Sequence, residues 1–198
     1  MNSDIITEDL ESRVILLMNW RRRAIRASNG HYLSSSYCRF WSNILILFNI
    51  ISAIAVLFFS NNKFFNSIGS TEGTFSGIFQ NSDILTAIAG LFVVLTTAIQ
   101  YVLKLEIKSR DAKSAGNDFT NIKRNIEIIL TGGDISTDSI QSIQISHTHT
   151  SRNHELVPKR LWSRSERKTQ AAFAEDREFE RSVLKRFGLD EGLLGTTD

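Results

Sequence analysis

Three scarcities narrow the class of protein to which this chain of 198 residues can belong. It contains a single cysteine, Cys38, so no disulfide can form within one chain. Its only proline, Pro158, predicts a break between two helices near the C-terminus. The third is a local absence of charged side chains: residues 40–59 and 84–103 contain no Asp, Glu, Lys, Arg or His.

Each of these uncharged segments holds 20 residues and is strongly apolar. A helix rises about 1.5 Å per residue, so about 20 residues cross the hydrocarbon core of a bilayer. A soluble helix of this length normally carries a charged face toward water. The sequence therefore predicts an all-α protein with a two-transmembrane helical hairpin, in preference to a buried hairpin of a soluble protein.

The charged residues are distributed unevenly around the two apolar segments. Between Arg13 and Arg39 there are six arginines and no acidic residue, whereas residues 60–83 carry one lysine and two acids. Cationic flanks stay in the cytoplasm, so we expect both termini there and residues 60–83 outside. We expect anionic lipid headgroups, in preference to nucleic acid, to contact the basic residues beside the first span. These residues are Arg21, Arg22, Arg23, Arg26 and Arg39.

The remaining regions have helical patterns. The pattern of residues 1–39 predicts a cytoplasmic helix that leads into the first span. We expect a kink in this helix near Asn29-Gly30. Residues 104–131 continue the second span with a seven-residue apolar repeat, which favours an antiparallel helical stalk with the N-terminal helix. Residues 132–198 form a C-terminal helical region, with helices expected over 136–151 and 165–187.

Polar side chains inside each apolar segment fall on one helical stripe, at spacings of three and four residues. Lipid does not favour such groups, so the stripes should face protein or water. One interpretation is helix packing, in which Asn49 or Gln100 makes an interhelical hydrogen bond. The other is a pore assembled from several copies, since two spans cannot enclose a channel. The candidate pore-lining residues are Asn49, Ser52, Thr86, Thr97, Gln100 and Lys104.

No arrangement of residues predicts catalysis. The sequence has no glycine-rich phosphate loop, no Ser/His/Asp pattern and no paired carboxylates in a plausible pocket. His147, His149 and His154 have a spacing that fits no structural zinc site, and we expect exposed histidines at a helix end. We therefore expect no enzymatic activity, no cofactor and no metal.

The order of several short motifs resembles the SLATT domains, the SMODS and SLOG-associating two-transmembrane effector domains. Trp20-Arg21-Arg22-Arg23-Ala24 and His31-Tyr32 precede the first span, and Ile88-Ala89-Gly90-Leu91 opens the second. Glu106 follows that span, and the next helix carries Phe119 where the family often has tyrosine. The resemblance covers about Leu10 to Trp162.

This resemblance implies a function in bacterial antiviral defence. Proteins of this kind are thought to oligomerise into inner-membrane pores when a partner senses infection, which causes abortive infection. The implied partner is a sensor or signal generator, such as a nucleotide cyclase or a reverse transcriptase. The alternative that the residues leave open is a non-conducting membrane anchor or scaffold that recruits a cytoplasmic partner.

Overall fold

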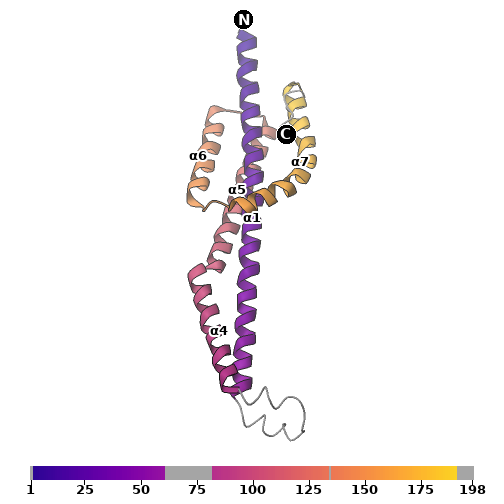
Figure 1. Cartoon of the computed structure of the whole chain (residues 1–198). Helices are drawn as coiled ribbons and strands as arrows, with labels where there is room; N and C mark the ends of the chain where they lie inside the picture. Colours follow the sequence, from indigo (N-terminus) through magenta and orange to yellow (C-terminus); the bar gives the residue numbers. More distant parts are fainter. Residues whose placement is uncertain (1, 61–81, 134, 191–198) are drawn as a thin grey trace. The chain divides into compact units, whose positions relative to one another are not determined.

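The computed structural model describes residues 2–60, 82–133 and 135–190. Within these ranges the chain forms α-helices and no strand, which confirms the expected all-α class (Figure 1). The helices are α1 (Asn2–Ser60), α4 (Ser82–Leu103), α5 (Leu105–Gly132), α6 (Thr137–Asn153) and α7 (Lys159–Phe187). Nearly all of the predicted external loop, including Ser70, lies outside the described residues.

The chain divides into two compact units. The terminal unit combines Met1–Ser36 with Ser109–Asp198, and the apolar unit comprises Tyr37–Lys108. The terminal unit is therefore built from both ends of the chain, and the apolar unit is inserted between its two parts.

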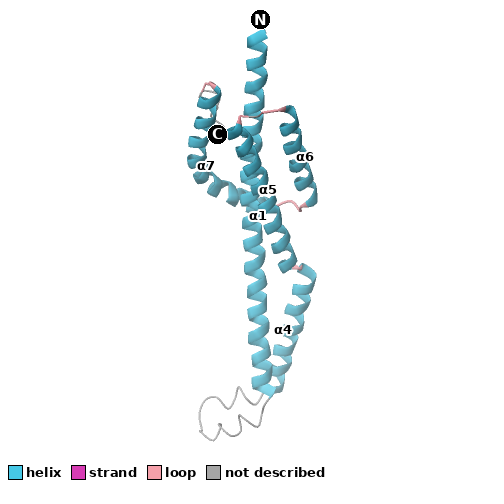
Figure 2. Ribbon diagram, turned by 180° about the vertical axis from the view of Figure 1, so that it is seen from behind, coloured by secondary structure: helices cyan, strands magenta, loops and turns pink. Residues whose placement is uncertain are grey.

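The core of the terminal unit contains apolar side chains from four helices. Phe119, Ile122 and Ile126 of α5 are buried together with Val14 and Leu17 of α1. These α5 positions belong to the predicted seven-residue repeat and its interleaved positions, so the repeat does form a packing face. Ile143 of α6 and Val183 and Leu184 of α7 join the same cluster. In Figures 1 and 2, α6 and α7 lie on opposite sides of the α1–α5 pair.

The expected kink at Asn29-Gly30 does not interrupt the helix, since α1 runs from Asn2 to Ser60. Gly30 has a packing role instead. A Cβ atom at this position would lie 3.2 Å from two ring carbons of Trp162, closer than most van der Waals contacts. The absence of a side chain therefore lets the start of α7 approach α1 closely.

The C-terminal helices begin and end at recognisable caps. Ser136 precedes α6, and its hydroxyl accepts a hydrogen bond from the Ser139 amide at 3.2 Å. α7 begins directly after Pro158, six residues earlier than expected, because proline is favourable at a helix start. It ends at Gly188, whose φ of 69° gives the left-handed cap for which glycine is suited.

Two helical stretches, Asp9–Leu57 and Thr86–Gly132, contain segments long and apolar enough to cross a bilayer, and the apolar unit holds the uncharged part of each. Their large apolar side chains are mostly exposed, including Leu57 at 71% and Val94 at 65%. The core helix of a soluble protein would bury such residues. The exposure favours association of this unit with a membrane.

The predicted continuous helix from the second span into residues 104–131 was also wrong. Lys104 separates α4 from α5 and has a φ of 46°, in the left-handed region that non-glycine residues rarely adopt. Backbone hydrogen bonds nevertheless continue across the break, from Lys104 N to Gln100 O and from Lys108 N to Lys104 O. The sequence gives no warning of this break, because neither glycine nor proline lies nearby.

Candidate functional site

A cluster of polar side chains joins α1 and α4 inside the apolar unit. The Asn49 amide donates hydrogen bonds to Gln100 Oε1 at 3.3 Å and to Thr97 Oγ1 at 3.5 Å. The hydroxyl of Thr96 donates to Asn49 Oδ1 and is also close to the carbonyl of Phe92. The two helices therefore satisfy one another's polar groups, which would be costly to leave unpaired in lipid.

One polar atom of this cluster has no hydrogen-bond partner. The Nε2 atom of Gln100 is buried and has no acceptor among the described residues. A buried amide donor without an acceptor costs about 1–3 kcal/mol. An acceptor supplied by another molecule would remove this cost.

The predicted pore-lining residues are only partly brought together. Asn49, Thr97 and Gln100 lie in the polar cluster, as the packing interpretation expects. Ser52 and Thr86 are half-buried, whereas Lys104 is exposed at the helix break. Sequence reasoning missed Thr96, which lies one position from the stripe.

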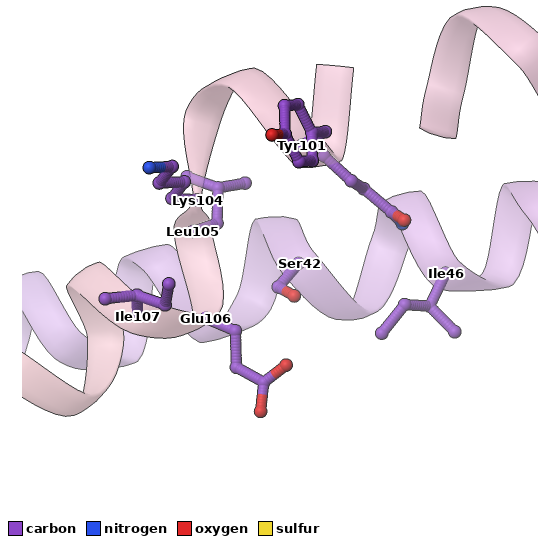
Figure 3. Close-up of a pocket in the computed structure, with 8 residues that line it drawn as sticks. Ser42, Ile46, Tyr101, Lys104, Leu105, Glu106 and Ile107 are labelled. Atoms are coloured by element: carbon purple, nitrogen blue, oxygen red, sulfur yellow. The ribbon is translucent and has the colours of Figure 1, made fainter. Parts of the chain in front are cut away.

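A cavity of about 290 Å³ lies beside the helix break, within the apolar unit. Ser42, Gln100, Lys104 and Glu106 supply its polar groups, and Tyr101 is among the side chains around it. In Figure 3 the Lys104 ammonium and the Glu106 carboxylate point to different sides. The ammonium and the carboxylate are therefore directed to different sides of the helix break, although the two residues are close in sequence.

The N-terminal arginines form an ion-pair network in the terminal unit. Arg21 is only 2% exposed, and its guanidinium donates to Glu127 Oε1 at 2.8 Å and to Asp176 Oδ1 at 2.6 Å. It also stacks over the ring of Phe179, 4.4 Å from the centroid. Arg21 thereby connects α1 to both α5 and α7.

Arg22 makes a two-pronged contact with α7. Its Nε and Nη2 atoms each donate to one oxygen of the buried Glu180 carboxylate at 2.7 Å. This hydrogen bonding raises the pKa of Arg22, against the opposing effect of its burial, and the charge of Glu180 adds to the increase. The planar guanidinium matches a carboxylate in this geometry.

The expectation that Arg21 and Arg22 contact lipid headgroups was therefore wrong. Both guanidinium groups bind carboxylates inside the protein. Arg23, Arg26 and Arg39 are exposed, so the lipid prediction stays open for them. One sequence signal could have revealed the network: Asp176 and Glu180 are four residues apart and share a helix face.

The histidines form a second cluster in the terminal unit. The ring of His31 stacks on Phe119 with centroids 5.5 Å apart and an interplanar angle of 16°. His154 lies edge-on to His31 at 6.3 Å, and His147 lies edge-on to Phe119 at 5.8 Å. His154 Nε2 is 3.0 Å from Asp118 Oδ2.

In two of these histidines the protonated form is disfavoured. Burial lowers the pKa of His31, and the neighbouring His154 lowers it further. Burial also lowers the pKa of His147, with a further contribution from the charge of Arg23. The expectation of exposed histidines was wrong for His147 and His154, although His149 is exposed. Within the described residues, no three His, Cys, Asp or Glu side chains are grouped to hold a metal ion.

Three of the four family-pattern residues lie close together. His31 and Phe119 stack, and the neighbouring Tyr32 donates a hydrogen bond to Asn117 Oδ1 at 2.7 Å. The Tyr32 ring lies against Gly116, where an added Cβ would come within 3.0 Å of it. Glu106, the fourth, belongs to the apolar unit.

Comparison with family models, with curated protein sequences and with solved structures finds no match to this chain.

Proposed function

We propose that this chain is a pore-forming membrane effector of a bacterial antiviral defence system. It crosses the inner membrane twice with both termini in the cytoplasm. Several copies oligomerise and permeabilise the membrane when a partner sensor or its product signals infection. A nucleotide cyclase or a reverse transcriptase is the partner that the SLATT resemblance implies.

The observation that carries this proposal is the polar cluster on the segments of α1 and α4 in the apolar unit, whose large apolar side chains are mostly exposed. Thr97 is exposed, and Gln100 has a buried amide donor with no acceptor in the described part of the chain. A second copy could supply that acceptor, because polar groups within lipid favour interhelical hydrogen bonds. In this proposal, Asn49 exchanges its partners within the chain for partners between chains, and the exchanged groups then line the lumen.

The polar cluster also favours a second candidate function. Asn49 already has three partners within one chain, as expected for a packing contact with no lumen. A membrane anchor would use this contact to hold its two spans together and would present the terminal unit to a cytoplasmic partner. The two functions differ in whether the membrane becomes permeable.

Leakage from liposomes separates the two functions. The full chain is reconstituted with an entrapped fluorescent dye, alone and with extract from infected cells. We expect the parent chain to release dye and Gln100→Leu to release much less, because the lumen loses a hydrogen-bonding group and dewets.

Val94→Leu is the matched control, because it changes an exposed apolar residue of the same helix. It should leak like the parent at equal membrane abundance. Tight vesicles under every condition would support the anchor instead. If Gln100→Leu leaked as fast as the parent, the assignment of Gln100 to the lumen would be wrong.

A further inference from the structure

The terminal unit contains a cavity of about 440 Å³ that the proposed pore does not use. This histidine cavity is bounded by segments from across the sequence, including α1, Phe119 of α5, the end of α6 and Trp162 of α7. Its volume is in the range of small-molecule sites in proteins. A molecule bound in this cavity would therefore contact α1, α5, α6 and α7.

Aromatic residues are among those that line the histidine cavity. His31 and Phe119 are stacked on each other, and His147 lies edge-on to Phe119. Trp162 is 38% exposed, although its ring is held against Gly30. Because His31 and Phe119 are only 7% and 4% exposed, the exposed ring of Trp162 offers most of the aromatic surface to a flat ligand.

The charge around the histidine cavity is predominantly positive. Arg23 and Arg26 are lining residues with exposed side chains, and Glu155 is the one carboxylate among the lining residues. Asp118 is not a lining residue, and its carboxylate lies 3.0 Å from His154 Nε2. The lowered pKa of His147 agrees with this positive charge, since it is caused first by burial and then by the charge of Arg23.

We propose that the histidine cavity binds a small aromatic anion, with its ring against Trp162 and its carboxylate or phosphate on Arg23. Guanidinium groups bind both kinds of anion by charge-assisted hydrogen bonds. The ligand would bridge α1 to the C-terminal helices of the terminal unit. This proposal does not depend on pore formation, because binding is measured on the unstimulated chain.

Calorimetric titration of the full chain in detergent micelles tests the proposal, with protein-free micelles as the blank. The probes are naphthoate, naphthyl phosphate and the neutral analogue naphthamide. At least one anion should bind about tenfold more tightly than naphthamide, since one charge-assisted hydrogen bond contributes on that order. The preferred anion identifies the site as a carboxylate or a phosphate site.

Arg23→Gln should weaken the bound anion about tenfold and leave naphthamide unchanged, because only the charge-assisted contact is lost. Arg124→Gln is the matched control, since Arg124 is an exposed arginine of the same unit and does not line the cavity. Circular dichroism confirms that both variants stay folded. Equal binding of naphthamide and the anions, no binding at all, or an unchanged affinity in Arg23→Gln would each overturn the proposal.

Discussion

Arg21 shows how far apart in the sequence the partners of one side chain can lie. Its guanidinium pairs with Glu127 and Asp176, which belong to two different helices. Removing one member of a buried ion pair leaves the remaining charges uncompensated. The stability of the terminal unit should therefore depend strongly on this single residue.

We expect Arg21→Met to lower the free energy of unfolding of the terminal unit by about 3 kcal/mol. Denaturant unfolding followed by circular dichroism measures this change. Arg124→Met, at an exposed position, should change stability by less than about 0.5 kcal/mol. Equal stabilities of the two variants would show that the Arg21 network does not hold the helices together.

The buried histidines predict a dependence of stability on pH. Folding lowers the pKa of His31 and of His147, so the unfolded chain binds more protons than the folded chain in this pH range. Their contribution to stability is complete above about pH 6.5, the ordinary histidine pKa. It is lost as the pH falls through the lower pKa values that these histidines have in the folded chain. The titratable or charged groups that act on these two rings are His154, beside His31, and Arg23, beside His147.

Replacing His31 by phenylalanine should reduce this acid sensitivity, because a ring remains on Phe119 but can no longer bind a proton. The effect is measured as the change in melting temperature between about pH 5 and pH 8, the interval in which histidine side chains titrate. His149→Phe, at an exposed position, should keep the pH dependence of the parent. A parent whose melting temperature rises on acidification would contradict the prediction.

At the scale of the helices, the break at Lys104 has a testable energetic cost. A non-glycine residue in the left-handed region costs about 1 kcal/mol, and glycine avoids it. We therefore expect Lys104→Gly to stabilise the chain in micelles by about that amount. Lys104→Ala retains Cβ and should give no such gain, so equal effects of both variants would place the break elsewhere.

The helices differ in how well the sequence predicts them. Ser136, Pro158 and Gly188 are local signals, and the helices of the C-terminal region begin or end beside them. The seven-residue repeat and its interleaved positions likewise identified Ala115, Phe119, Ile122 and Ile126 as buried residues of α5, because periodicity is a property of neighbouring residues. The Lys104 break has no such signal. The carboxylate partners of Arg21 and Arg22 depend on tertiary contacts, which a run of arginines does not specify.

At the scale of the whole molecule, membrane topology is the prediction on which the proposed function depends. Labelling of single cysteines tests this topology, and Ser163 is a suitable C-terminal position because it is exposed. In a Cys38→Ala background, Ser70→Cys should react with an impermeant maleimide in intact cells. Ser163→Cys should react only after the cells are permeabilised. External labelling at Ser163 would exclude a cytoplasmic C-terminus.

Because the terminal unit is formed by both ends of the chain, its two parts are synthesised at different times. Asp176 is made 155 residues after Arg21, a delay on the order of ten seconds at typical translation rates. During that interval both apolar segments emerge while the N-terminal arginines still lack their partners on α7. In the proposed topology, the arginines of the nascent chain are then available as the positive charges that would retain the N-terminus in the cytoplasm. The same side chains would serve first as a topological signal and afterwards as internal ion pairs.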